Sequence, residues 1–145
     1  MKRFLPFLPC LSLILMSFGF AFHSGENAPI RIHIPNVKEG KGEILITLFN
    51  KENGFPEESA LAYRTWKMTP GKTLVLNGIP AGKYAMAILH DLDNNQKMTY
   101  NILGIPQDGY AASPDGGSRL SKPRFKNAVF LHTSKGTDLT IPIYY

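Results

Sequence analysis

Cysteine is almost missing from this sequence of 145 residues, since the only one, Cys10, lies in an apolar segment near the start of the chain. The rest of the chain therefore has no disulfide, no cysteine-ligated zinc site and no thiol nucleophile. Helical periodicity is also nearly absent, and there are no internal repeats or low-complexity tracts. These absences exclude disulfide-based and repeat architectures.

The first 21 residues have the features of a signal peptide. Lys2 and Arg3 form a positive n-region, an apolar run follows over residues 4–22, and Gly19 and Ala21 fit the positions before a cleavage site. The alternative is an uncleaved membrane anchor, because a run of this length falls within the range of roughly 17–25 residues that spans a bilayer. Two prolines interrupt its first half, however. We expect cleavage near Ala21, no membrane span in the mature chain, and a periplasmic or secreted location.

Charge of one sign is not concentrated in any part of the mature chain. The leader holds two of the 16 basic residues and none of the 11 acidic ones, which leaves 14 basic and 11 acidic residues and a net charge of +3. The densest basic group lies within residues 119–126, where a solvated loop explains it. No basic stripe with interleaved aromatics is present, so nucleic acid is not an expected partner.

Alternation of apolar and polar residues predicts strands along the mature chain. Ile30, Ile32 and Ile34 alternate with polar residues and predict a half-buried strand. Residues 43–49 are apolar on both sides, which is typical of a central strand. Further strands are predicted over residues 72–76, 83–89, 128–131 and 137–145. About seven short strands with hardly any helix predict an all-β fold, an antiparallel β-sandwich formed by a single domain over residues 22–145.

Two long connections interrupt this pattern, over residues 51–68 and 101–126. The first contains residues 58–62, which predict one helical turn, and the second is rich in Gly, Pro, Ser and Asp. Loops of this length in a compact domain are usually either functional or disordered.

A polar loop follows the strand predicted over residues 83–89. Asp91, Asp93 and Asn95 place oxygen atoms at alternate positions, as at the start of a calcium loop, and the main-chain oxygen of Lys97 and the side chain of Thr99 would be further ligands. The sequence lacks the glycine and the bidentate glutamate that such a loop uses, so any calcium binding is expected to be weak, about 10⁻⁴–10⁻³ M. The alternative is a set of Asx turns that cap their own backbone. Calcium is the only cofactor that these residues suggest, and both alternatives remain open.

His90 directly precedes Asp91 and raises the question of a catalytic or metal-binding pair. The other three histidines are isolated in sequence, whereas a zinc site needs three or four ligands. No serine lies in a Gly-x-Ser-x-Gly elbow. We therefore predict no catalytic residue and interpret His90 as a strand-end side chain bonded to a neighbouring loop. The alternative is a hydrolytic or carbohydrate-active enzyme that uses His90 and Asp91.

A second polar cluster covers residues 104–110, with the sequence GIPQDGY. Its proline and two glycines predict a rigid turn that displays Tyr110 next to Asp108. Trp66 lies in the other long connection. If the loops converge at one end of the sandwich, His90, Asp108, Tyr110 and Trp66 would form a binding surface. The alternative is that the aromatic residues fill the open ends of the sandwich.

Three motifs carry a family resemblance. Residues 78–85 (GIPAGKYA) resemble the L-P-x-G-x-Y hairpin of transthyretin-like and collagen-adhesin B-type domains, and such a turn predicts a positive φ at Gly82. Residues 82–95, 103–110 and 123–128 together resemble a family of secreted bacterial proteins, domain of unknown function 2141. At residues 94–99 the chain lacks the glycines and the second aspartate that are frequent in that family.

The resemblance implies an exported immunoglobulin-like or transthyretin-like β-sandwich with no assigned activity. The sequence as a whole therefore predicts a non-catalytic module that is envelope-associated or binds a ligand, a protein or an envelope component. The oligomeric state does not follow from the sequence.

Overall fold

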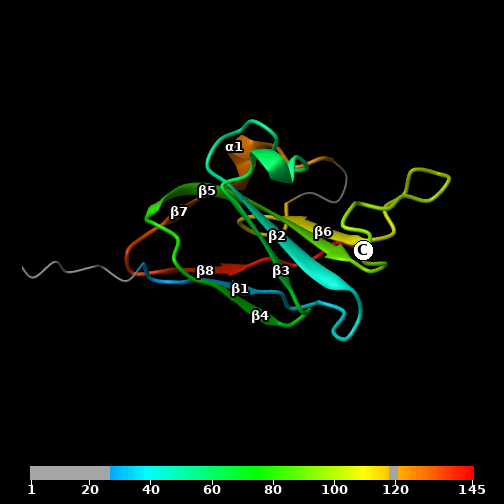
Figure 1. Ribbon diagram of the computed structural model, residues 1–145, viewed down its shortest axis with the longest axis horizontal. Coiled ribbons are helices and arrows are strands. Elements are labelled where there is room, and N and C mark those ends of the chain that lie inside the picture. Colours follow the sequence, from blue (N-terminus) through cyan, green and yellow to red (C-terminus); the bar gives the residue numbers. More distant parts are fainter. Residues whose placement is uncertain (1–26, 118–120) are drawn as a thin grey trace, which may run out of the picture.

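The computed structural model describes residues 27–117 and 121–145, so the predicted signal peptide lies outside the described part. Within that part, eight strands form two sheets. Helix is limited to the 3₁₀ turn η1 (Ser59–Leu61) and to the four residues of α1 (Phe125–Ala128). The predicted all-β class and the helical turn near residue 60 are confirmed (Figure 1).

The smaller sheet contains β4 (Thr73–Leu76), β1 (Ile30–His33) and β8 (Thr137–Thr140), in that order. β1 runs antiparallel to β4 but parallel to β8. The prediction of a purely antiparallel fold is therefore wrong for this pair. Because β1 and β8 are separated by the whole larger sheet in sequence, no hairpin constrains their relative direction.

The larger sheet has the order β3 (Arg64–Met68), β2 (Glu43–Phe49), β5 (Gly82–Asp91) and β6 (Gly109–Ala112). The long strand β5 pairs with β2 along one side. On its other side, β7 (Val129–His132) pairs with residues 82–85 and β6 with residues 87–90. The end of β5 and the start of β6 therefore lie side by side, and the segment between them leaves and re-enters the sheet at one place.

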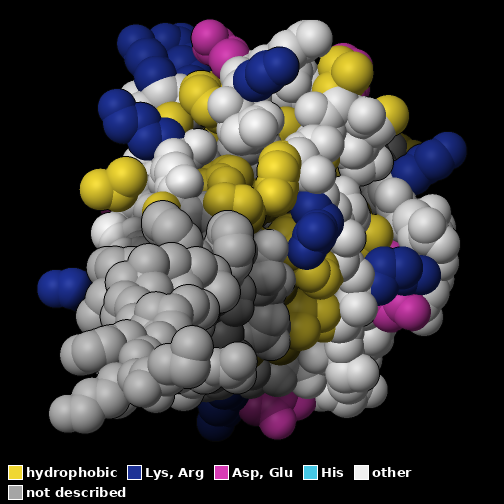
Figure 2. All heavy atoms as spheres, turned by 60° about the vertical axis from the view of Figure 1, so that its left-hand side comes forward, with side chains coloured by type: hydrophobic (Ala, Val, Ile, Leu, Met, Phe, Trp, Pro, Cys, Tyr) yellow, Lys and Arg dark blue, Asp and Glu magenta, His cyan; other side chains and the backbone are white. Residues whose placement is uncertain are grey.

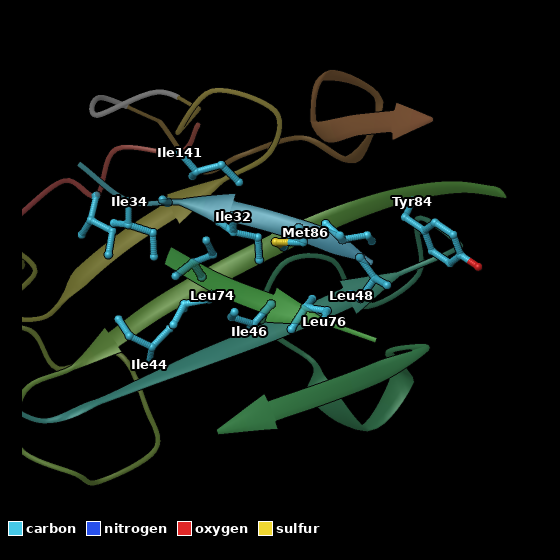
Figure 3. Close-up of a cluster of buried hydrophobic side chains, with 14 of the residues drawn as sticks. Ile32, Ile34, Ile44, Ile46, Leu48, Leu74, Leu76, Tyr84, Met86 and Ile141 are labelled. Carbon is cyan, nitrogen blue, oxygen red and sulfur yellow. The ribbon is translucent and has the colours of Figure 1, made fainter. Parts of the chain in front are cut away.

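The core lies between the two sheets. In β1 the isoleucines are fully buried and the polar residues between them are exposed, as the alternating sequence predicts. Figure 3 shows the apolar side chains from both sheets pointing toward one another: Ile32, Ile34, Leu74 and Leu76 from the β1 and β4 region, and Ile44, Ile46, Leu48 and Met86 from β2 and β5. This packing holds β2 and β5 in the centre of the larger sheet.

Two strands occur within the connections that were expected to be loops. β3 lies in the first and β6 in the second. The aromatic residues of these connections take part in packing: Phe55 contacts Phe49 and Phe125 on the outer face of the larger sheet, under η1 and α1. Trp66 packs against the main core instead.

The hairpin before β5 has the predicted turn but a different geometry. Tyr84 donates a hydrogen bond from its hydroxyl to the Pro80 carbonyl (3.0 Å), as in the tyrosine corner of sandwich domains. The prediction of a positive φ at Gly82 is wrong, because the left-handed residue is Gly78 (φ 72°). Gly82 is instead covered by the Tyr84 ring, which lies 3.2 Å from the place where a Cβ would stand.

The face shown in Figure 2 carries Lys and Arg side chains that are spread out rather than joined in a stripe, and several stand close to Asp or Glu. The described residues form three surface ion pairs: Arg31–Asp138, Lys67–Glu43 and Lys122–Glu57. This pattern agrees with the near balance of basic and acidic residues over residues 22–145.

Candidate functional site

The candidate site is the end of the sandwich where β5 passes into the loop of residues 91–99. β5 carries His90 and Asp91 to this end, and both side chains are fully buried. Burial follows from the position of β5 between β2 and β6, because His90 pairs with Ile44 on one side and Gly109 on the other.

The imidazole of His90 uses both ring nitrogens. Nε2 lies 2.7 Å from the carbonyl oxygen of Lys41, which can only accept, so Nε2 carries the proton. Nδ1 accepts a hydrogen bond from the Tyr145 hydroxyl at 2.7 Å. Burial raises the pKa of Tyr145, and the N–H of Lys38, which donates to the same hydroxyl, opposes this rise. His90 therefore joins the β1–β2 loop to the end of the chain.

The carboxylate of Asp91 caps the loop that follows it. Its two oxygens accept the backbone N–H groups of Asn95 (3.2 Å) and Gln96 (2.6 Å). Asp93 accepts the N–H and the amide of Asn95 and the hydroxyl of Thr99. Asn94 and Gln96 have positive φ values of 60° and 63°, which the capped turns require.

Asp108 closes the loop from the other side. This carboxylate is 1 % exposed and accepts the N–H groups of Leu92 (2.9 Å) and Thr99 (2.8 Å), which are the two ends of the loop. The polar run after β5 and the segment before β6 are thus one structural unit, although 16 residues separate Asp108 from Leu92 in the chain.

Calcium has a set of candidate ligands here, but a different one from that predicted. Carboxylate oxygens of Asp91, Asp93 and Asp108 lie within 4.8 Å of one another, a donor set that suits a hard cation. Asn95 and Thr99, which were predicted as ligands, bond to Asp93 and to each other. The main chain at Lys97 takes part through its N–H, which the Asn95 side chain accepts. Both oxygens of Asp91 and of Asp108 already accept N–H groups, as expected for loops that cap themselves.

The predicted surface of His90, Asp108, Tyr110 and Trp66 does not form. His90 and Asp108 are buried, so neither side chain reaches a ligand at the surface. Trp66 is on β3 and Tyr110 on β6, with β2 and β5 between them. Their pairing through Ile46, Ile88 and Ala111 also places Trp66 on the core side of the sheet and Tyr110 on the outer side.

Two further polar side chains that suggest nucleophilic chemistry are structural. Ser113 is buried and donates from its hydroxyl to the Ala128 carbonyl, and it accepts the N–H of Met86. His132 is buried and bonds to Thr137 and to the Ile79 carbonyl. No buried side-chain polar atom lacks a partner among the described residues.

The polar residues 93–97 at this end are exposed, and beyond them the large exposed side chains are apolar. Residues 99–107, which we call the finger, form a narrow hairpin beyond Asp108, with a bridge between Tyr100 and Pro106. In Figure 1 this yellow-green loop projects from the right of the molecule. Ile102 is 101 % exposed and Leu103 is 77 % exposed. Sequence reasoning passed over these residues because it looked for ligands and aromatics, although an apolar Ile-Leu pair inside a Gly/Pro-rich loop was a usable signal.

Among the described residues, no helix is long and apolar enough to cross a membrane. No curated protein and no solved structure matches the chain.

Residues 32–140 match the family described as "uncharacterized protein conserved in bacteria (DUF2141)". The match covers seven of the strands completely and the second half of β1, and it includes the loop and the finger. His90, Asp91 and Asp108, which carry the resemblance seen in the sequence, are the residues that hold this end of the sandwich together. The chain belongs to the DUF2141 family.

Proposed function

We propose that this protein is an exported, non-catalytic β-sandwich module that binds a component of the bacterial cell envelope through its finger. The observation that carries the proposal is the division of this end of the molecule into a polar interior and an apolar tip. His90, Asp91 and Asp108 are buried and bonded, while Ile102 and Leu103 stand in solvent. The buried groups build a support, and the exposed ones are available for contact.

The finer fold assignment is part of this proposal. We assign the sandwich to the immunoglobulin-like or transthyretin-like type, supported by the two facing sheets and by the Tyr84 corner. In such folds, binding residues sit on loops at the ends of the sheets and rigid strands position them. The finger has this location, since it connects β5 to β6.

The competing function is an enzyme that uses His90 and Asp91. A general base must lie within hydrogen-bond reach of its substrate. The contacts of His90 argue against this role, because both nitrogens are engaged by protein groups and the side chain is 0 % exposed. Both carboxylate oxygens of Asp91 likewise already accept hydrogen bonds from backbone N–H groups.

Binding to isolated envelope membranes tests the proposal. Residues 22–145 contain all the described strands and both hydrophobic clusters, so they are a suitable purified form. The fraction that co-sediments with envelope membranes should fall at least about fivefold in Ile102→Ser/Leu103→Ser. Leu131→Ser is the matched control, because Leu131 is also exposed (62 %) but lies on β7; it should bind as the wild type does.

Two results would overturn the proposal. One is equal sedimentation of the wild type and the finger variant. The other is turnover of an ester or polysaccharide by the purified protein that is lost in His90→Gln while the melting temperature is maintained, because that would assign catalysis to the buried pair.

A further inference from the structure

The finger concentrates exposed apolar surface in a way that the rest of the described molecule does not. Four of the eight exposed large hydrophobic side chains belong to it: Tyr100, Ile102, Leu103 and Ile105. Exposed apolar residues are normal when scattered singly, whereas a cluster marks a contact surface. The loop that carries the cluster projects beyond the sheets, so it would meet a partner before they do (Figure 1).

The backbone of the finger is largely bonded within itself. Gln107 N–H donates to the Thr99 carbonyl (2.8 Å) and Asn101 N–H to the Ile105 carbonyl (2.9 Å). The Asn101 side chain accepts the N–H groups of Leu103 and Ile105 at 2.9 and 3.0 Å. The main-chain carbonyl of Asn101 accepts the N–H of Gly104. A loop built in this way can leave water without exposing most of its N–H groups to an apolar medium.

Charge is arranged in layers along the finger. Residues 98–107 contain no charged side chain. Tyr100 lies nearer the base of the finger than the apex formed by Ile102 and Leu103, and Lys97 precedes the base of the finger. Lys41, whose carbonyl bonds to His90, belongs to the adjacent loop with Lys38, whose ammonium lies over the Tyr145 ring. Of the acidic groups at this end, Asp91 and Asp108 are buried, Asp93 and Glu39 are exposed, and Glu43 forms an ion pair with Lys67.

An apolar tip followed by an aromatic ring and then by lysines is the order that a membrane interface favours. Acyl chains accept aliphatic side chains, tyrosine prefers the headgroup level, and lysine prefers the charged surface. A protein partner fits this finger less well. A stable protein interface buries about 800 Å² and roughly 20–30 residues on each side, whereas this convex tip offers four large side chains. A second copy of the chain would face the same shortage of area.

We infer that the finger inserts Ile102 and Leu103 into the headgroup and upper acyl region of a lipid bilayer. This inference rests on the proposed function and specifies the envelope component as lipid. Asn101 holds the inserted turn in shape, and the cap formed by Asp91 and Asp108 fixes the finger to the sheet.

Vesicle co-sedimentation tests the inference with no other protein present. The probes are vesicles of phosphatidylethanolamine and phosphatidylglycerol at about 3:1 and vesicles of phosphatidylcholine alone. Residues 22–145 should bind the first kind. Ile102→Ser/Leu103→Ser should lower the partition coefficient at least about tenfold, since each buried methylene contributes to insertion. Ile102→Trp should bind vesicles at least as strongly as the wild type, which a merely structural role of Ile102 would not predict. Leu131→Ser should leave the partition coefficient unchanged.

The outcomes separate the inference from the proposed function. Failure of the wild type to bind either kind of vesicle, or binding unaffected by the apex double variant, would overturn the lipid inference. If envelope membranes still bind through the finger in that case, the proposed function stands and the partner is a non-lipid component. If neither envelope membranes nor vesicles bind, both fail. Binding to anionic vesicles that is unchanged by the apex variant but lost in Lys97→Gln would assign the contact to charge alone.

Discussion

The imidazole of His90 shows how a residue that is typical of active sites can serve the fold. Its ring bridges the carbonyl of Lys41 and the hydroxyl of Tyr145, so it connects the loop after β1 with the end of the chain. A buried polar group is expensive unless both its donor and its acceptor are satisfied. His90 meets this condition by its two nitrogens, which explains why a histidine is suited to this position on β5.

Gly42 is needed for the contact between this loop and β5. Its φ is +63°, and a Cβ would overlap the carbonyl group of Asp91. Gly40 has a similar φ of +76° but open space around it. Gly40→Ala should therefore cost only the backbone strain, about 1–2 kcal/mol. Gly42→Ala should cost this and a further ~1–3 kcal/mol from overpacking. Urea denaturation of both variants measures the difference, and equal losses would show that the close approach to Asp91 is not present.

Tyr84 should make the stability sensitive to alkaline pH. Burial raises its pKa above the usual 10.0, and the neighbouring Tyr63 adds to the rise. Above pH 10 the unfolded chain releases this proton before the native state does, so the native state binds more protons and the free energy of unfolding falls. Below pH 10 this loss is absent.

The corresponding variant is Tyr84→Phe, which cannot ionise. At neutral pH it should be about 0.5–1.5 kcal/mol less stable than the wild type, because the hydrogen bond to Pro80 is lost. The gap should narrow as the pH rises from 10 to 11. Tyr100→Phe, on the exposed finger, is the control for removing one phenol. A gap that stays constant across this pH range would contradict the assignment.

The strands that the sequence predicts well are those whose burial is strong and regular. β1, β2 and β5 combine isoleucine, leucine or alternating apolar residues with flanking turn signals, so local pattern is sufficient. β3 and β6 were missed for different reasons. β3 (RTWKM) is an edge strand with little burial, and β6 (GYAA) is a short strand of Gly, Ala and one Tyr that forms by pairing with β5. The parallel β1–β8 pair depends on the fold as a whole and has no local signal.

The site was predictable only where its residues are close together in the sequence. The Asp-x-Asp-x-Asn run indicates either an ion or self-capping from its own residues. The contribution of Asp108 could not be read from the chain, because it arises when β6 pairs with β5 and brings this carboxylate under the loop. The finger was treated as part of a long connection, and its apolar apex gains meaning only when its exposure is known.

The loop of residues 91–99 should keep its shape without calcium. The carboxylates of Asp91, Asp93 and Asp108 accept five hydrogen bonds from backbone N–H groups of this loop, two each at Asp91 and Asp108 and one at Asp93. These hydrogen bonds already offset the charge of the carboxylates. We therefore expect that millimolar Ca²⁺ leaves the melting temperature unchanged. Asp91→Asn/Asp93→Asn should lose about 1–3 kcal/mol of stability with or without the ion, because N–H groups lose acceptors.

The opposite result would assign a metal site to the cluster of Asp91, Asp93 and Asp108. An ion present at about 100 times its Kd stabilises a protein by roughly 2.7 kcal/mol. A rise in the melting temperature that requires Ca²⁺, that Mg²⁺ does not reproduce and that the double variant abolishes would therefore contradict the self-capped loop.

The molecule is extended between two different ends. The start of β1 lies at one end, where Pro29 and Ala28 approach Gly136, and the finger lies at the other (Figure 1). The first strand therefore begins at the end of the sandwich opposite the finger.

Removal of the leader is the prediction that concerns the whole chain. Cleavage after Ala21 leaves eight residues before β1, so no strand of either sheet is lost. Intact-mass analysis of protein from its native host should therefore show an N-terminus at Phe22 or within a few residues of it. Purified residues 22–145 should unfold in one cooperative transition, because both hydrophobic clusters lie within them. Recovery of the chain from the membrane fraction with Met1 to Ala21 still attached would instead assign the apolar run to a membrane anchor.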